Sequence, residues 1–169
     1  NAVKRSKPLK RKPKSSASKR TSEAGGTSSR TRTRKTTNPR GAMVKKVDAV
    51  FSQYVRLRAT DETGHGECYT CGSRRHWSEV DAGHFMSRAC MSTRWHEDNV
   101  MFQCKRCNGF RSGEQFLFAR NLDAQFGEGK AEELFRLSKQ TRKWTRAELE
   151  QMYHHYKRLV DELRSSKGL

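Results

Sequence analysis

Apolar residues are scarce in this sequence. Only 33% of its 169 residues are hydrophobic, and no run of 18 apolar residues occurs along it. A helix that crosses a membrane needs about 20 mostly apolar residues, so the composition excludes a membrane-spanning protein. The first residues also lack the apolar segment of a cleavable signal peptide. We therefore expect one domain with a small core, working in an intracellular, reducing compartment.

Large aliphatic side chains are almost absent from residues 1–42, where Val3 and Leu9 are the only two. The same segment carries 14 of the 36 Lys and Arg residues but only one of the 18 Asp and Glu residues. Such a segment cannot bury enough apolar surface to offset the entropy of ordering. We predict a disordered basic tail over 1–42, either a nonspecific DNA arm or a solvated extension, followed by a folded domain over 43–169.

The formal net charge of the whole chain is +18. A cation this strong indicates a polyanionic partner. Nucleic acid is favoured over an anionic membrane surface.

Four segments of the expected domain have apolar residues at helical spacing. They cover residues 44–60, the segment 113–127 that ends at Gly127, the segment 130–140, and the region 145–165. The last segment has Thr145 followed by Glu148, which is the pattern of a capping box. The segments at 128–165 are expected to flank a cysteine-bearing core at 67–126. The apolar stripes of 46–60 and 145–165 are available either for this domain or for pairing two chains of a homodimer.

Four of the five cysteines form two C-x2-C pairs, Cys68 with Cys71 and Cys104 with Cys107. Two intervening residues let both thiolates reach one tetrahedral ion at about 2.3 Å, and four thiolates complete the shell of a structural zinc. Buried or redox-active cysteines are the alternative, but one redox motif would not need a matching second pair. Cys90 is left over and is interpreted as a small buried or free thiol. The sequence thus predicts a structural zinc that replaces part of the core.

The segment between the two pairs has room for a β-hairpin, and the second pair leads into an expected helix near 108–126. Each C-x2-C pair would form a short metal-binding turn, called a zinc knuckle. A knuckle, then a hairpin, then a second knuckle at the start of a helix make up a treble-clef arrangement. The insert also contains more oxygen and imidazole groups than a structural hairpin requires. These are Asp81, His84, His96, Glu97, Asp98 and Asn99, with His84 in an expected strand at 80–86. We therefore expect catalytic chemistry between the two halves of the zinc site.

The stretches "CYTCG", "DAGHFMSR" and "RWHEDNVMFQCKRCN" together resemble the NinG/Rap recombination nucleases of phages. The resemblance covers about residues 44–160 and is most specific over 67–113. More broadly, the pattern resembles the HNH, or ββα-metal, endonucleases, and its CxxCN ending is similar to phage endonuclease VII. The resemblance implies a small α+β fold, with a zinc-stabilised treble-clef ββα-metal core and flanking α-helices.

The resemblance also implies roles for three residues. His84 matches the general base, and Asn99 matches a residue that orients the base or its loop through hydrogen bonds. Asn108 matches a ligand of the catalytic cation, Mg²⁺ or Mn²⁺, although an asparagine at this place can also simply cap a helix.

One position departs from the family pattern. The related enzymes usually carry Asp or His directly before the base, and here that residue is Gly83. Asp81 lies on the same strand face but about 6–7 Å further along the strand. A bulge at Gly83 would close this distance and make Asp81 the second metal ligand. The alternative is a strand-edge carboxylate paired with an arginine.

The expected function is hydrolysis of DNA phosphodiester bonds, selective for branched DNA such as a Holliday junction, in phage recombination. The resemblance implies action in the cytoplasm of a bacterial host. Candidate phosphate contacts, or else generic surface charges, are Arg88, Arg94, Lys105, Arg106 and Arg111. A non-catalytic zinc-finger DNA-binding module and an RNA-binding zinc protein are the alternatives.

Overall fold

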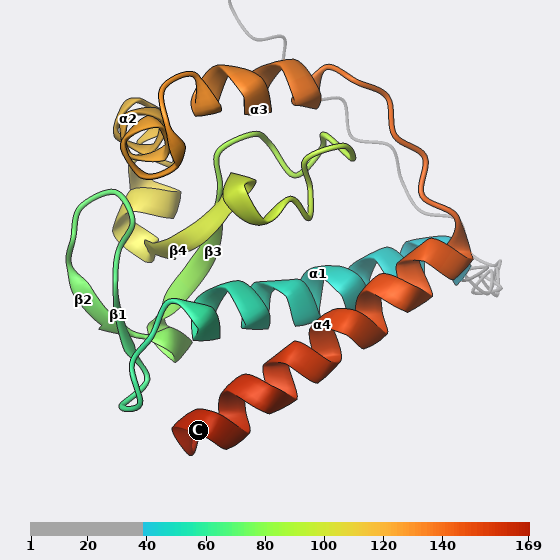
Figure 1. Ribbon diagram of the computed structural model, residues 1–169, viewed down its shortest axis with the longest axis horizontal. Coiled ribbons are helices and arrows are strands. Elements are labelled where there is room, and N and C mark those ends of the chain that lie inside the picture. The colour runs from blue at the N-terminus through green and yellow to red at the C-terminus, as the bar shows by residue number, and fades with distance from the viewer. Residues whose placement is uncertain (1–38) are drawn as a thin grey trace, which may run out of the picture. The chain divides into compact units, whose positions relative to one another are not determined.

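The computed structural model describes residues 39–169, which form a small α+β unit with short hairpins (Figure 1). The predicted tail lies outside the described residues as far as position 38. The elements are α1 (Pro39–Arg58), β1 (His65–Glu67), β2 (Arg74–His76), β3 (Val80–His84), β4 (Val100–Cys104), α2 (Gln115–Phe126), α3 (Lys130–Ser138) and α4 (Arg146–Lys167). None of the described helices combines the length and the apolarity needed to cross a lipid bilayer.

Helix α1 begins at Pro39, so the predicted boundary at residue 42 is wrong. Proline is favoured in the first helical turn because its φ is preset, and because an N–H at that position would have no intrahelical partner in any case. The first turn has no apolar stripe, which is why hydrophobic periodicity missed it. The predicted stripe itself is confirmed, since Val47, Val50, Phe51 and Val55 are buried.

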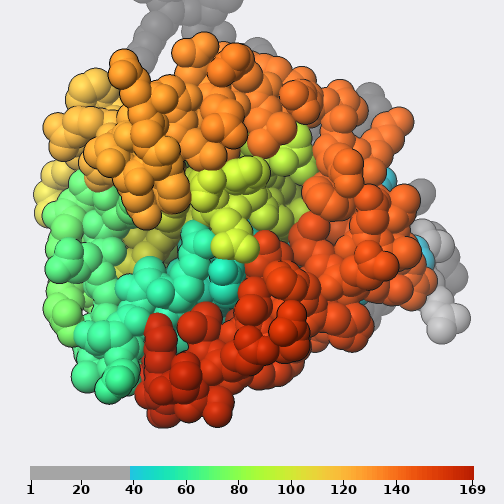
Figure 2. All heavy atoms as spheres, in the orientation of Figure 1, coloured from blue at the N-terminus to red at the C-terminus, as the bar shows by residue number. Residues whose placement is uncertain are grey.

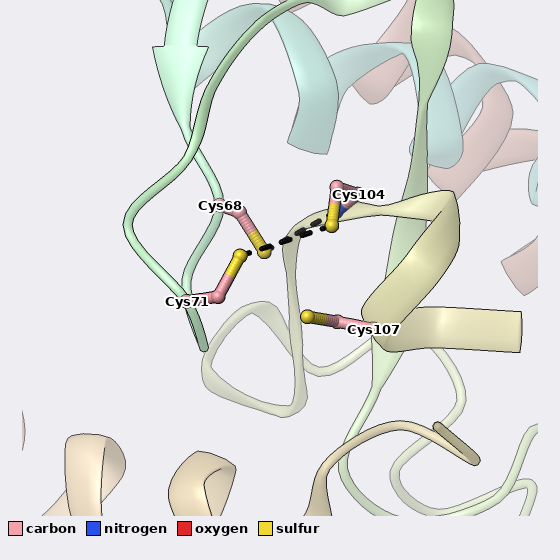
Figure 3. Close-up of side chains that lie close together, drawn as sticks. All are labelled: Cys68, Cys71, Cys104 and Cys107. Atoms are coloured by element: carbon pink, nitrogen blue, oxygen red, sulfur yellow. Dashed lines mark hydrogen bonds between the residues drawn. The ribbon is translucent and has the colours of Figure 1, made fainter. Parts of the chain in front are cut away.

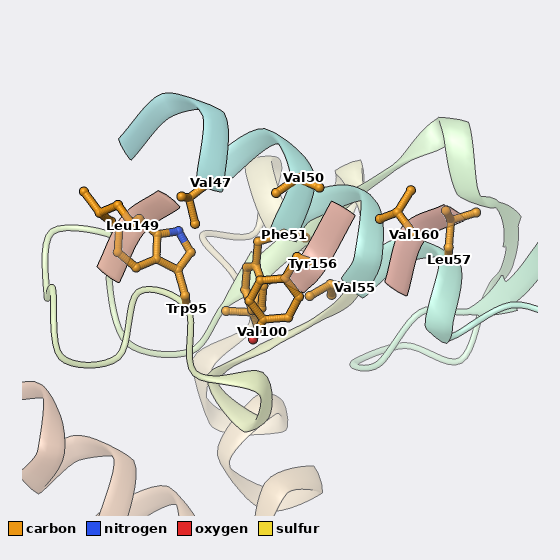
Figure 4. Packing of buried hydrophobic residues seen from close by; sticks show 11 residues of the cluster. Val47, Val50, Phe51, Val55, Leu57, Trp95, Val100, Leu149, Tyr156 and Val160 are labelled. Carbon is orange, nitrogen blue, oxygen red and sulfur yellow. The ribbon is translucent and has the colours of Figure 1, made fainter. Parts of the chain in front are cut away.

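The main core lies between α1 and α4, which run side by side (Figures 1 and 4). The Phe51 and Tyr156 rings meet edge to face with centroids 4.8 Å apart. The predicted capping box is confirmed, because the Thr145 hydroxyl accepts from the Glu148 amide and the Glu148 carboxylate accepts from the Thr145 amide. The apolar stripes of the two helices are therefore used within one chain.

The predicted hairpin between the cysteine pairs is confirmed as an antiparallel pairing of β3 with β4. Asp81 stands opposite Gln103 and Gly83 opposite Met101 in an unbroken register. The predicted bulge at Gly83 is therefore wrong. A Cβ built on Gly83 would overlap the side chain of Gln103. Because Gly83 has no side chain, the Gln103 side chain from β4 fits over this position and the strand pairing needs no bulge. The strand also ends at His84, two residues earlier than expected.

Strand β4 is buried along its whole length and serves two separate cores. Val100 belongs to the α1–α4 core, whereas Met101 packs with Phe118, Leu122 and Leu134 of α2 and α3. This follows from the strand's period of two, which sends successive side chains to opposite faces.

The prediction of a single helix near residues 108–126 is wrong. A π-helical turn, η3 (Arg106–Phe110), follows β4, and α2 starts only at Gln115. Between them Ser112 and Glu114 have φ values of 50° and 49°, in the left-handed region that interrupts a helix. Helix α2 ends at Gly127 as predicted, and α3 confirms the short third helix.

The long loop from 85 to 99 lies between α3 and the α1–α4 pair, where Figure 2 shows its surface in yellow-green. The Ser92 hydroxyl donates to the carbonyl of Leu137 in α3 at 2.8 Å. The Trp144 indole donates to the carbonyl of Met91 at 2.9 Å. Contacts to two distant parts of the chain thus hold this loop in place.

Candidate functional site

The two cysteine pairs converge on one point, as Figure 3 shows. Cys68 and Cys71 lie in the turn between β1 and β2, and Cys104 and Cys107 lie where β4 passes into η3. All four sulfurs lie within 4.8 Å of one another. The Sγ atoms of Cys71 and Cys104 are 3.9 Å apart, close to the roughly 3.8 Å expected between thiolates that each bind one tetrahedral zinc at about 2.3 Å. The cluster could therefore bind a structural zinc.

The surroundings of the sulfurs fit the same ion. The Cys104 amide donates to the Cys68 sulfur at 3.3 Å, which stabilises a thiolate. Burial and the neighbouring sulfurs raise the pKa of Cys107 to about 12, so this thiol keeps its proton unless a cation replaces it. A divalent ion would compensate the charge of thiolates held so close together. Cys90 is not part of the cluster, in agreement with its interpretation as a separate thiol.

Asp81 and Asn108, 27 residues apart, meet beside this cluster. The Asn108 side-chain nitrogen donates to Asp81 Oδ2 at 2.9 Å. Asn108 lies inside η3, whose N-cap is Lys105, so the helix-cap alternative is wrong. Among residues 39–169 Asp81 forms no salt bridge with an arginine. The structure thus brings together two side chains that each offer an oxygen to a hard cation.

His84 ends β3 and is half-buried. Its Nε2 lies 3.0 Å from the carbonyl oxygen of Arg94, and its Nδ1 lies 3.2 Å from that of Ala82. A neutral imidazole carries one N–H, so only one of the two ring nitrogens donates to its carbonyl and the other keeps a lone pair. Burial, with a smaller effect of the Arg88 charge, lowers the pKa of His84 below 6.5, so the ring is neutral at pH 7. None of these hydrogen bonds involves Asp81 or Asn108, which are reached from the other face of β3.

Asn99 is completely buried and closes the base of the 85–99 loop. Its amide oxygen accepts from the Met86 amide at 2.6 Å, and its nitrogen donates to the carbonyls of Met86 and Thr93 at 3.0 and 2.9 Å. Thr93 directly precedes Arg94, whose carbonyl holds the imidazole of His84. Asn99 therefore fixes the segment whose Arg94 carbonyl contacts His84.

Arg94 is not free to contact a phosphate. Its guanidinium donates to both carboxylate oxygens of Asp48 in α1, at 2.8 and 2.6 Å. The indole of Trp95 also donates to Asp48, at 2.9 Å. Burial would raise the pKa of Asp48, but the hydrogen bonds and charge of Arg94 outweigh it and lower the pKa. No sequence pattern indicates this pair, because its members lie 46 residues apart.

A hollow of about 340 Å³ opens beside His84. Its lining includes Lys45, Asp48 and Ser52 from α1, together with Ala82, Arg88 and Trp95. Lys45 and Arg88 are exposed cations at this hollow, so a phosphate could be held next to the imidazole. Sequence analysis missed Lys45, because nothing in the sequence brings α1 to the end of β3.

The remaining predicted cations lie on the second knuckle and after it. Lys105 and Arg106 are exposed and line another hollow, of about 360 Å³, with Cys71 and Cys104. Arg111 is exposed but pairs with Glu114 at 2.7 Å. These side chains are open to solvent, in contrast to Arg94.

The acidic cluster that follows His96 is structural. Glu97 accepts from Arg58 at 2.7 Å and from Tyr54 at 2.8 Å, and Asp98 pairs with Lys130 at 2.9 Å. These carboxylates join the 85–99 loop to α1 and α3. They are not part of the metal site that their density in the sequence suggested.

The sequence was compared with protein families, with known proteins and with solved structures. The sequence model described as Bacteriophage Lambda NinG protein matches residues 1–166. The chain is 25% identical over 131 residues to Protein ninG of Escherichia phage lambda, covering 77% of this chain and 61% of that protein. It is 27% identical over 131 residues to Protein ninG of Salmonella phage P22, covering 77% and 62%. The chain thus spans about three fifths of the length of these relatives. No solved structure matches it.

Proposed function

The chain belongs to the NinG family of bacteriophage proteins, and from this premise we propose that it is a metal-dependent endonuclease that hydrolyses phosphodiester bonds in DNA. The observation that carries the proposal is the hydrogen bond between Asn108 and Asp81, because it joins two potential cation ligands next to the four-cysteine cluster. We further propose that the core is of the ββα-metal, treble-clef type. The β1–β2 knuckle, the β3–β4 hairpin and the second knuckle that leads into η3 support this assignment.

Asp81 and Asn108 would hold the catalytic cation. A carboxylate and an amide oxygen are hard ligands that suit Mg²⁺ or Mn²⁺. The bound cation would neutralise charge on the phosphate and on the leaving oxygen. An asparagine amide can present either its oxygen or its nitrogen to a neighbour, so Asn108 has the chemistry for both its observed bond and this role.

His84 would act as the general base. Its ring is neutral at pH 7, so one ring nitrogen has a lone pair that can accept a proton from water. Asn99 and the Arg94 carbonyl hold it in position. In an in-line displacement the attacking and leaving oxygens lie on opposite sides of phosphorus. The base would activate the attacking water and the cation would stabilise the leaving oxygen, so both must reach one phosphate at the end of β3, where His84 lies.

The DNA surface would include the hollow beside His84, where Lys45 and Arg88 can bind a phosphate, and the exposed Lys105 and Arg106. We propose branched DNA, such as a Holliday junction, as the substrate, in recombination within the bacterial host cell. A homodimer would provide two symmetric cuts at such a junction. The alternative is a non-catalytic zinc-containing protein that binds DNA or RNA. It would use the cluster and the cationic surface, but would not require a neutral His84 facing a hollow.

A cleavage panel tests the proposal. Zinc-loaded protein is mixed with a four-way junction, a fork, a flap and a linear duplex, each with Mg²⁺, Mn²⁺ or EDTA. We expect metal-dependent cleavage, fastest on a branched substrate, and loss of cleavage in His84→Ala with DNA binding retained. Binding without cleavage under every condition would favour the non-catalytic alternative. Competition with RNA of the same shape then identifies the preferred nucleic acid.

A further inference from the structure

Gln103 is a completely buried polar residue of β4, and the fold satisfies only half of its amide. Its Nε2 donates to the Thr70 hydroxyl at 3.2 Å and to the Gly113 carbonyl at 2.8 Å. Its Oε1 is buried and has no hydrogen-bond partner among residues 39–169. Buried polar atoms without partners are rare in native proteins, so this oxygen needs an explanation.

The orientation of the amide is fixed. A carbonyl oxygen only accepts hydrogen bonds, so the group that faces Gly113 must be the NH₂ of Gln103. Exchanging the two amide atoms would set two acceptors against each other. The unpartnered atom is therefore the oxygen, and it is held away from Thr70 and Gly113.

The oxygen lies on the face of the hairpin that carries the Asp81 side chain. Gln103 and Asp81 are direct cross-strand partners, and partners in an antiparallel pair project from the same face. Gln103 Oε1 occupies the space that a side chain at Gly83 would need, because a Cβ there would overlap it. Gly83 and Asp81 also share this face, two residues apart on β3. Asn108 contacts the same face through its bond to Asp81.

We infer that Gln103 supplies a third protein oxygen to the cation site of Asp81 and Asn108. The inference rests on the proposed function and deepens it, because it names a further ligand of the same divalent cation. Mg²⁺ and Mn²⁺ accept neutral amide oxygens as well as carboxylates. With Asp81 as the one charged ligand, the site leaves the divalent ion with net positive charge for a phosphate. Gln103 directly precedes Cys104, so the four-cysteine cluster would keep its backbone in place.

Mn²⁺ binding measures this role without any cleavage assay. Full-length, zinc-loaded protein is titrated with Mn²⁺, and the free ion is followed by electron paramagnetic resonance. Gln103→Met keeps an unbranched side chain of similar size but removes the oxygen. The double variant Gly83→Asp with Gln103→Ala places a carboxylate in the space that the glutamine leaves. Asn108→Ala serves as the reference for a lost ligand. Thr70→Val removes a partner of Nε2 but leaves Oε1 intact. Because the Thr70 hydroxyl also contacts the Cys68 sulfur at 3.5 Å, this variant is the control when its zinc content matches that of the wild type.

We expect Gln103→Met to weaken Mn²⁺ affinity about ten-fold or more, as Asn108→Ala does. Thr70→Val should bind like the wild type, and the double variant should recover most of the affinity. A folded Gln103→Met protein with wild-type Mn²⁺ affinity would overturn the inference. If that variant fails to retain zinc, Gln103→Ala is compared with the wild type and with the double variant. Weaker Mn²⁺ affinity in Gln103→Ala that the double variant recovers supports the inference, and Gln103→Ala with wild-type Mn²⁺ affinity refutes it.

The same titration separates this inference from the proposed function. If the wild-type protein neither binds Mn²⁺ nor cleaves DNA, both the proposed function and the role of Gln103 are refuted. Wild-type protein that binds and cleaves, while Gln103→Met binds equally well, would remove only the role of Gln103.

Discussion

Arg94 and Asp48 form a two-point ion pair between the 85–99 loop and α1, with nitrogen–oxygen distances of 2.8 and 2.6 Å. The carbonyl of the same Arg94 lies 3.0 Å from Nε2 of His84. One residue thus links the first helix to the proposed base, through its side chain on one side and its backbone on the other.

Replacing Arg94 should therefore affect stability and catalysis more than DNA affinity. Arg94→Ala leaves the partly buried Asp48 without its partner and should lower the free energy of unfolding by about 2 kcal/mol. Urea denaturation measures this loss. Arg88→Ala is the matched control, since Arg88 is exposed at the hollow and should mainly weaken DNA binding and reduce its salt dependence. If Arg94→Ala changed the salt dependence as much as Arg88→Ala, Arg94 would be a phosphate contact after all.

The cleavage rate should depend on pH through His84. Burial lowers the pKa of His84 below its usual value of 6.5, and a general base must be unprotonated. The single-turnover rate should therefore be constant above about pH 7 and fall to half its maximum only below pH 6.5. In the same low range the unfolded chain binds a proton at His84 that the folded chain does not, so stability also falls as the pH drops. An apparent kinetic pKa above 7 for the base would contradict this assignment.

Asn108 should set the metal requirement of cleavage. Asn108→Ala removes a ligand, so a higher Mg²⁺ concentration should be needed for half-maximal rate, whereas Asn108→Asp keeps an oxygen and should retain activity. Cleavage rate is measured against Mg²⁺ concentration. Asn121→Ala provides the control, because Asn121 also donates a side-chain hydrogen bond, to the carbonyl of Tyr69, away from Asp81. Superimposable curves for wild type and Asn108→Ala would exclude a metal-binding role.

Removal of a cysteine ligand should release zinc and destabilise the fold. In Cys68→Ser or Cys107→Ser the metal contributes less folding free energy, so the melting temperature should fall sharply. Zinc content by metal analysis and thermal unfolding by circular dichroism measure the two effects. Cys90→Ser is the matched control, since Cys90 lies outside the cluster and should leave both quantities nearly unchanged. Fully folded wild-type protein without bound zinc would contradict the prediction.

Local patterns predicted the local features correctly. Thr145 with Glu148 predicted the start of α4, because a capping box depends on residues close in sequence. The C-x2-C spacing within each pair predicted the cluster even though the two pairs are far apart in the sequence, because one tetrahedral ion needs both pairs. The break between η3 and α2 depends on left-handed conformations at Ser112 and Glu114. The Ser112-Gly113 dipeptide is a turn signal, but the expected helix near 108–126 ran through it. Residues that are far apart in the sequence but in contact in the fold could not be paired from the sequence either.

Arg94 and Gln103 show this limit. Asp81 and Asn108 meet as the resemblance implied, but nothing in the sequence assigned Arg94 to Asp48. Gln103 was missed for the same reason. Its burial and its unpartnered oxygen follow from the register of β3 with β4 and from the absence of a side chain at Gly83.

The division of β4 between two cores has a consequence for cooperativity. Val100 ties the strand to the α1–α4 core and Met101 ties it to the α2–α3 core, while the cysteine cluster lies at the strand's end. Removal of zinc should loosen the α2–α3 half first, because its apolar cluster is the smaller. Amide hydrogens of α1 and α4 should then still exchange slowly with solvent when those of α2 and α3 exchange fast. Unfolding of the metal-free protein would proceed in two steps, and its calorimetric enthalpy would exceed its van't Hoff enthalpy.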